Sequence, residues 1–351
     1  MYRNTIKYWL PIFILLSAGC EKIIEFKGGE TEPKLVFYSN LEKDSLISCQ
    51  IGVSHAVFDP EFQPFQIKNA VVSLYKDDVF LEDLGYSDPI VSEYDNANTY
   101  PLSTYSSGTI YAEAGTDYRI EVSVPGFDKI QSEARLPELV PIIQLDTVML
   151  TTREYDWEYV TLRVKLKFQD PANIANFYRL VIFEQTGYYP GNRGYPFDPE
   201  IPVLVSINNI NWIESSDPLL VPPEEEDIFG SYEGNEFLIF SDEKIGGREY
   251  ELSFNLNSNN PYVDTSYHEF SNYYIYLQSI TEETYYYLSS LTKYHNHEND
   301  FLTEPVILYS NVENGLGVFT ASSYSSRTLT YGRYPVPGVT YEDPDDYWGE
   351  K

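Results

Sequence analysis

Strict alternation of apolar and polar residues is the feature that most limits the folds open to this chain. In the clearest example, from residue 47 to 53, every second residue is apolar: Ile47, Cys49, Ile51 and Val53. A period of two belongs to β-strands that bury one face. The composition agrees, because the 33 tyrosines suit strands and the 22 prolines separate them. The sequence therefore predicts a mainly β protein.

The strands fall into two groups along the chain. Short strands separated by turns over residues 34–135 predict an immunoglobulin-like β-sandwich. A segment that carries two prolines, 136–141, follows as a linker. The segment 142–345 is longer than the segment 34–135, and its strand pattern is less regular. We expect a second, larger β-rich domain there.

One segment has the marks of a helix, near residues 281–296. Ser279 and Glu282 have the spacing of a capping box, and Glu282 and Glu283 suit the positive start of a helix. The face predicted to pack onto a sheet carries Tyr285, Leu288 and either Thr292 or His295.

The N-terminus has the parts of an export signal. Arg3 and Lys7 precede a short apolar stretch, and three small residues then lead to Cys20. The apolar stretch is about half the ~20 residues that a membrane-spanning helix needs. Small residues ending in cysteine resemble the bacterial lipobox, which implies a signal peptide over 1–19, a lipidated Cys20 and a tether over 20–33. The alternative is an ordinary signal peptide followed by an unmodified cysteine.

The net charge of −31 limits the partners of the chain. So acidic a surface repels phosphate backbones, which argues against nucleic-acid binding. It also disfavours adsorption to anionic lipid, so the acyl group on Cys20 would be the membrane contact. Lipidation of Cys20 leaves Cys49 alone, so no intramolecular disulfide can form, and Cys49 is interpreted as a buried structural thiol.

Several segments together carry a family resemblance. In chain order they are the lipobox cysteine, residues 118–122, Asp170-Pro171 before 176–180, residues 240–247, the tyrosine-rich helix, and Glu304-Pro305 before 310–319. This set resembles the Bacteroidota lipoprotein family known as domain-of-unknown-function family 4249, over nearly all of the mature chain. The resemblance implies residence in the outer membrane and a role beside TonB-dependent receptors. It carries no catalytic residues.

Two glycine-containing segments have structural interpretations. Residues 314–317, Asn-Gly-Leu-Gly, are expected to supply backbone conformations with positive φ. Gly246-Gly247 is expected to form a turn between residues 237–240 and a strand that begins near Tyr250.

The candidates for a metal site are weak. His295 and His297 are two residues apart, and on a helix such side chains point in different directions, so we interpret them as a polar helix end that can meet exposed carbonyls. The acidic runs 224–227 and 342–346 lack the spacing of a calcium loop and are interpreted as solvated. We therefore expect no metal and no cofactor.

The most suggestive surface segment is an aromatic loop over residues 188–197. Aromatic rings among prolines and glycines in a long loop are suited to a partner or ligand. The candidate binding residues are Tyr188, Tyr189, Arg193, Tyr195 and Phe197. The alternative is a loop that folds its rings back onto its own sheet.

The sequence contains no G-x-S-x-G, P-loop, H-E-x-x-H or dinucleotide-binding pattern, so we do not expect an enzyme. The predicted function is an outer-membrane-anchored, non-catalytic accessory or ligand-capture partner of a TonB-dependent receptor. The alternative is a free-standing surface lipoprotein that binds glycans or acts in adhesion through exposed tyrosines.

Overall fold

The computed structural model describes residues 32–55, 66–87, 102–154, 157–188, 204–210, 213–221, 234–257, 269–297 and 306–332. The chain divides into two compact units, and the first, Met1–Pro33 with His55–Phe62, lies almost wholly outside these ranges. The description below concerns the second unit, Lys34–Ser54 with Gln63–Lys351. The predicted signal peptide, Cys20 and most of the tether lie outside the described residues.

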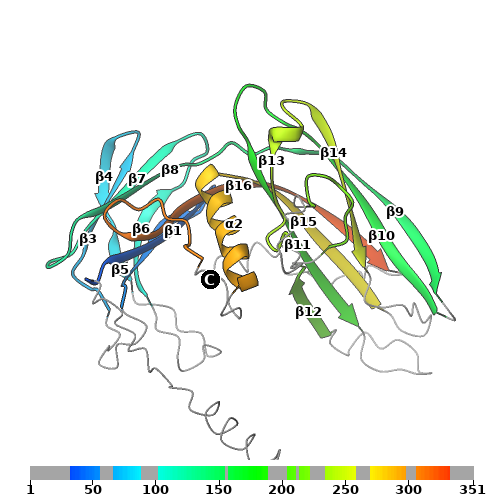
Figure 1. Cartoon of the computed structure of the whole chain (residues 1–351), viewed down its shortest axis with the longest axis horizontal. Helices are drawn as coiled ribbons and strands as arrows, with labels where there is room; N and C mark the ends of the chain where they lie inside the picture. Colours follow the sequence, from blue (N-terminus) through cyan, green and yellow to red (C-terminus); the bar gives the residue numbers. More distant parts are fainter. Residues whose placement is uncertain are drawn as a thin grey trace, which may run out of the picture. The chain divides into compact units, whose positions relative to one another are not determined.

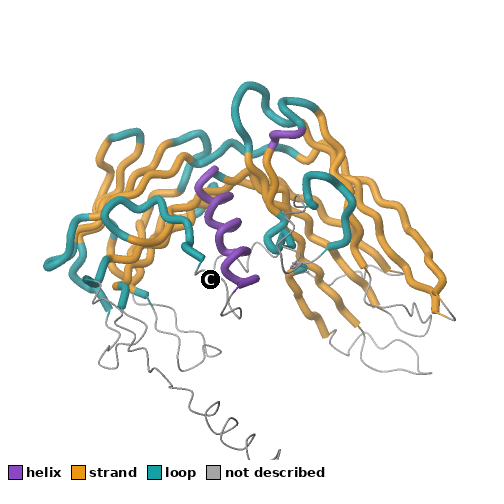
Figure 2. The backbone as a smooth tube through the Cα atoms, viewed as in Figure 1, coloured by secondary structure: helices purple, strands orange, loops and turns teal. Residues whose placement is uncertain are grey.

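Strands dominate the described residues, so the prediction of a mainly β protein is confirmed (Figure 2). Nine strands form the largest sheet: β12 (Leu204–Asn209), β11 (Phe177–Tyr188), β15 (Glu269–Ile280), β16 (Leu316–Gly332), β1 (Leu35–Glu42), β2 (Leu46–Val53), β6 (Ser103–Tyr111) and β5 (Gly85–Ser87) in that order, with β13 (Ile239–Ser241) paired to β11.

Two smaller sheets complete the described β-structure (Figure 1). One has the order β4 (Val79–Asp83), β3 (Val71–Lys76), β7 (Asp117–Ser123) and β8 (Ile130–Arg135). The other has the order β14 (Glu249–Asn257), β10 (Trp157–Gln169) and β9 (Ile142–Glu154). Each packs its apolar face against a different part of the nine-stranded sheet.

The first core lies between β1, β2 and β6 of the large sheet and the four-stranded sheet. The alternating residues Ile47, Cys49 and Ile51 are buried in it, as their spacing predicted. The core also takes Phe319 and Ala321 from β16, near the end of the chain. Phe319 packs edge-to-face on Phe37, with ring centroids 5.7 Å apart. Residues 34–135 therefore share this core with a strand that lies far away in the sequence.

The second core lies between β11 and β15 of the large sheet and the three-stranded sheet. Val164, Leu166 and Phe168 of β10 are fully buried there, while the residues between them face outward. This arrangement is what the alternation of that segment predicts.

β16 joins the two parts into one sheet. It pairs in parallel with β1 over Leu316–Ser322 and antiparallel with β15 over Ser322–Gly332. The segment before β9 is fixed to it as well, because the Ser325 hydroxyl donates to the Val140 carbonyl at 2.7 Å and accepts from the Ile142 amide at 3.1 Å. The predicted linker is thus held against β16.

Helix α2 (Glu282–His297) confirms the predicted helix. It packs on the face of the large sheet opposite the two cores, near β16, β13 and β11 (Figure 1). The predicted cap is wrong, because Ser279 belongs to β15 and the Thr281 hydroxyl instead accepts the Thr284 amide at 3.2 Å. Thr292 is buried and His295 is exposed, so Thr292 belongs to the packed face.

Two tyrosines, one inside the second core and one packed against it, give this core polar anchor points. The Tyr178 hydroxyl donates to Asp170 at 2.5 Å, and the Tyr250 hydroxyl donates to Asp217 at 2.9 Å. Burial, and then the hydrogen bond to Asp217, raises the pKa of Tyr250 to about 12. Burial, with the bond to Asp170, raises the pKa of Tyr178 further still. Both phenols therefore stay protonated in the folded chain when a free tyrosine would ionise.

These shifts predict alkaline destabilisation. A tyrosine in the unfolded chain ionises near pH 10, so its contribution is complete below pH 10 and is lost as the pH rises toward the folded pKa. Each such group costs about 1.4 kcal/mol per pH unit above pH 10. We expect the free energy of unfolding to fall by about 3 kcal/mol between pH 8 and pH 11, measured by urea denaturation. In the variant Tyr250→Phe, the free energy of unfolding should fall less steeply with pH. A urea midpoint of the wild-type protein that is the same at pH 8 and pH 11 would contradict the prediction.

Candidate functional site

The predicted aromatic loop connects two paired strands. β11 and β12 are antiparallel, and Tyr188 at the end of β11 lies opposite Leu204 at the start of β12. The backbone of Tyr188 belongs to the described part of the chain. The other four candidate residues, Tyr189, Arg193, Tyr195 and Phe197, lie outside the described residues, so their role stays a prediction.

Strands of the large sheet hold the ends of this hairpin in place. Tyr188 pairs with Glu269 at the start of β15, and Phe270 pairs with Gly332 at the end of β16. β11 is hydrogen-bonded to β15 along its whole length and to β12 and β13 on its other side. A loop whose ends leave such a scaffold starts from fixed positions, as binding loops commonly do.

A buried polar cluster lies on β11 and β15 close to that end of the sheet. The Tyr273 hydroxyl donates to Glu184 at 2.8 Å. On the opposite face of the sheet, Gln185 accepts from the Asn272 amide and the Tyr274 hydroxyl, both at 3.1 Å. Buried networks with satisfied partners fix side-chain positions. The end of the sheet before the hairpin is therefore held by hydrogen bonds on both faces.

His295 was predicted to meet an exposed helix carbonyl, but in the structure it contacts a carboxylate instead. Its Nδ1 atom lies 2.9 Å from a carboxylate oxygen of Glu236, and its ring centroid lies 6.3 Å from that of Phe237. The side chain of His297 lies outside the described residues. Within the described ranges, no three His, Cys, Asp or Glu side chains are grouped to hold a metal ion. At this end of α2, the described contact is thus an exposed hydrogen bond between His295 and Glu236.

Arg179 lies close to this helix end and was not predicted as a site residue. Its guanidinium carbon lies 5.6 Å from the centroid of the Phe237 ring, so one ring contacts both Arg179 and His295. A signal was present in the sequence, because Arg179 is the only charged residue between Phe177 and Phe183.

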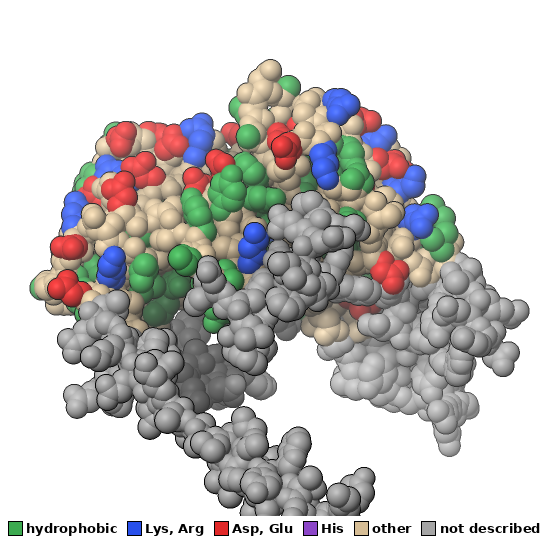
Figure 3. All heavy atoms as spheres, viewed as in Figure 1, with side chains coloured by type: hydrophobic (Ala, Val, Ile, Leu, Met, Phe, Trp, Pro, Cys, Tyr) green, Lys and Arg blue, Asp and Glu red, His purple; other side chains and the backbone are tan. Residues whose placement is uncertain are grey.

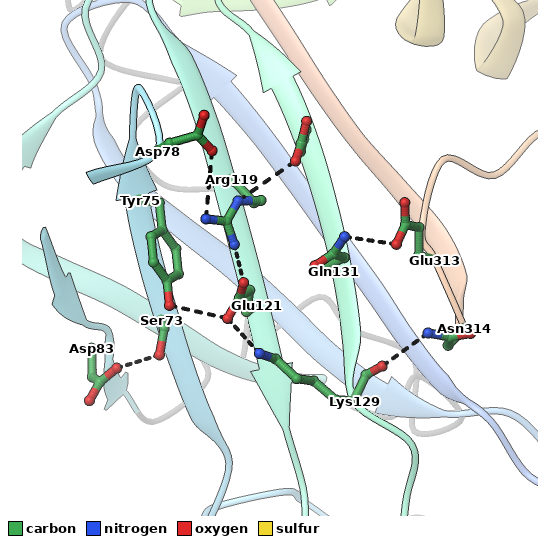
Figure 4. A network of polar contacts seen from close by, with 11 residues as sticks. Ser73, Tyr75, Asp78, Asp83, Arg119, Glu121, Lys129, Gln131, Glu313 and Asn314 are labelled. Atoms are coloured by element: carbon green, nitrogen blue, oxygen red, sulfur yellow. Dashed lines mark hydrogen bonds and ion pairs between the residues drawn. The ribbon is translucent and has the colours of Figure 1, made fainter. Parts of the chain in front are cut away.

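The outer face of the four-stranded sheet carries the network drawn in Figure 4. Arg119 forms ion pairs with Glu121, with Asp78 at 3.7 Å and with Glu133 at 3.6 Å, and stacks 3.9 Å from the Tyr75 ring centroid. Hydrogen bonds from Lys129 and then Tyr75 lower the pKa of Glu121. Acidic and basic side chains are interspersed on the visible surface of this part (Figure 3). Arg119 and Lys129 thus offset the negative charge of the carboxylates on this face of the sheet.

The network continues into the segment before β16 and protects a sheet edge. The Glu313 amide donates to the Gln131 carbonyl at 2.8 Å, and the Gln131 side chain donates to the Glu313 carboxylate at 2.7 Å (Figure 4). The Ser132 hydroxyl donates to the Asn311 carbonyl at 2.9 Å. β8 is an edge strand, and an uncovered edge is a site for unwanted strand pairing. These contacts give this part of residues 310–319 a structural role.

Three segments that carry the family resemblance meet around Asp170. This carboxylate is 1% exposed and accepts from the Tyr178 hydroxyl and, at 2.6 Å, from the Gly247 amide. Next to it, the backbone amide and the side chain of Asn176 both donate to Asp242 at 2.9 Å. The segments around 170, 176–180 and 240–247 thus form one cluster whose described interactions are structural.

The backbone conformations predicted for the glycine-containing segments are confirmed. In residues 314–317, Asn314 has φ 58° and Gly317 has φ 109°. Gly246 and Gly247 have φ 48° and 75° and form the predicted turn before β14. An alanine at 247 would also place its Cβ 2.8 Å from the Cβ of Ala172.

Comparison with known families agrees with these observations. The model of the family described as "Domain of unknown function (DUF4249)" matches residues 21–328. The chain belongs to the DUF4249 family. No match was found among the curated proteins. The DUF4249 match extends from the residue after Cys20 into β16, so it includes the Asp170 cluster, the β11–β12 hairpin and α2.

Cys49 of this DUF4249 chain is a buried free thiol, as predicted. Burial raises the pKa of the thiol well above its ordinary value. Since the thiolate is the nucleophilic form, the side chain acts as a small core residue.

None of the helices in the described residues is both long and apolar enough to cross a membrane.

Proposed function

We propose that this DUF4249 protein is anchored in the outer membrane by lipid on Cys20. There it acts as a non-catalytic accessory or ligand-capture partner of a TonB-dependent receptor. The observation that carries the proposal is the β11–β12 hairpin, because its connection contains Tyr189, Arg193, Tyr195 and Phe197. Aromatic residues and arginine are the residue types that dominate binding energy at protein interfaces.

The anchor and the charge fit such a role. Two or more acyl chains on a cysteine hold a protein at a membrane stably, whereas one chain binds only marginally. A net charge of −31 keeps the rest of the surface away from anionic lipid. A protein tethered in this way is concentrated beside other outer-membrane proteins, which favours association with a neighbouring receptor.

The proposal is tested by affinity purification of the tagged protein from crosslinked native outer membranes, followed by mass spectrometry. We expect a TonB-dependent receptor in stoichiometric amount. The variant Cys20→Ser should leave the membrane fraction and lose the receptor. Recovery of the anchored protein alone would contradict the proposal, and glycan-array binding by that protein would support the free-standing glycan-binding alternative.

A double substitution of the hairpin provides the matched variant. Tyr189→Ala with Tyr195→Ala should lower recovery of the receptor at least about tenfold, since removing an interface anchor costs about 2 kcal/mol or more. The control is Tyr111→Ala, because Tyr111 is 55% exposed on β6. Equal recovery from the double variant and from the control would show that the hairpin is not the contact.

A further inference from the structure

Arg179 is a charged residue on a face of β11 that packs on a helix. Odd-numbered residues of this strand lie on the face of the sheet that carries α2, since the ring centroid of Phe177 lies 5.1 Å from that of Tyr285. Arg179, two residues further along, lies on the same face and stacks over Phe237. The guanidinium is thus placed over an aromatic ring, on the face of the sheet that carries α2.

The described residues supply Arg179 with no opposite charge. Its Nε atom is buried and has no hydrogen-bond partner among them, and none of their carboxylates forms an ion pair with it. Burial alone lowers the pKa of the guanidinium. The half-buried guanidinium therefore lacks an opposite charge in the described residues, and an added anion would supply one. The side chain retains partial exposure to solvent, so an anion can reach it.

The surroundings indicate what kind of anion fits. An apolar cluster lies on the same side of the sheet, formed by Ile239, Ile280, Leu288, Phe177, Phe237, Tyr285 and Tyr287. Gln278 lies directly opposite Arg179 on β15, so an amide is available beside the guanidinium. Glu236 follows one residue before Phe237 and pairs with His295, which places a negative charge near the end of the cluster.

We propose that Arg179 anchors a binding site for a monocarboxylate that carries an apolar body. A carboxylate can accept two parallel hydrogen bonds from one guanidinium, and its single charge balances the single cation. The apolar cluster would contact the rest of the ligand, as in most small-molecule sites. A phosphate dianion would leave one charge unbalanced near Glu236. Arg179 lies at the opposite end of β11 from Tyr188, so this site can exist whether or not the hairpin binds a receptor.

Phenylacetate is a suitable probe, and 2-phenylacetamide is its neutral counterpart. Thermal unfolding of the full mature protein in detergent, at constant ionic strength, should show a Tm that rises with phenylacetate concentration, because a ligand that binds the folded state stabilises it. Phenylacetamide and inorganic phosphate should give no comparable rise. Isothermal titration calorimetry with phenylacetate then gives the dissociation constant. No rise in Tm with phenylacetate, or an equal rise with phosphate, would overturn the proposal.

Variants of Arg179 separate binding from folding. Arg179→Met should fold with an equal or higher Tm, since it removes an unpaired, half-buried charge, and should lose the response to phenylacetate. Arg179→Lys keeps the charge without the planar fork, and its affinity should fall at least about tenfold. The control Arg163→Met removes an exposed arginine of β10 and should respond like the wild type. A wild-type response in both Arg179 variants would overturn the proposal.

Discussion

Replacing Gly317 with alanine should destabilise the protein by at least about 4 kcal/mol, which is among the largest effects of single substitutions. Gly317 has φ 109°, a conformation that residues with a Cβ rarely adopt. An added Cβ would lie 1.9 Å from the Phe37 carbonyl oxygen and 2.9 Å from the Phe37 nitrogen. Phe37 is fully buried in the first core, so its backbone has no room to move. The variant should accumulate as insoluble protein or unfold at much lower urea concentration.

A second glycine provides the control for this experiment. Gly108 lies in β6, and a Cβ added there would have no atom within 4 Å. Gly108→Ala should therefore change the free energy of unfolding by no more than about 0.5 kcal/mol. Similar urea midpoints for the two variants would contradict the close packing of β16 against β1 at Gly317.

Replacing Asp170 with alanine should cost about 3–5 kcal/mol. The substitution leaves the buried Tyr178 hydroxyl and the Gly247 amide without their acceptor. Hydrogen bonds to a charged group contribute about 1.5–3 kcal/mol each, and an unsatisfied buried donor adds a desolvation cost. Because Asp170 joins β11 to the turn before β14, we expect the loss to appear in global unfolding measured by urea denaturation.

Two further variants test the order of effects at this cluster. Asp170→Asn keeps one acceptor oxygen and should cost less than Asp170→Ala. Tyr178→Phe removes the donor itself, leaves the Gly247 amide bonded, and should cost about 1–2 kcal/mol. A loss of stability for Asp170→Ala no larger than that for Tyr178→Phe would contradict the role of Asp170 as the acceptor of both hydrogen bonds.

Much of the fold follows from local sequence patterns. The alternation of Ile47, Cys49 and Ile51 predicted which side chains are buried, and all three lie in the first core. The helix was found from its acidic start and its apolar face. The cap was missed because Ser279 and Thr281 are both hydroxyl residues ahead of the helix, and only the end of β15 shows which one is free to cap it.

Strand partners were beyond the reach of the sequence. A period of two predicts a strand and its buried face, but it does not indicate which strand lies beside it. The parallel pairing of β1 with β16 connects opposite ends of the chain. The local feature that the sequence predicted there is the positive φ of Asn314 and Gly317. The same limit holds for the candidate site, since nothing local shows that Arg179, Phe237 and His295 lie together.

Site-specific photocrosslinking from the hairpin tests the proposed function most directly. A photoreactive amino acid is placed at Tyr195 in one strain and at the exposed Tyr111 in another, and crosslinked products are taken from native outer membranes. The proposed function predicts a crosslink from position 195 to a TonB-dependent receptor and none from position 111. Absence of a receptor crosslink from position 195, with the protein correctly anchored, would contradict it.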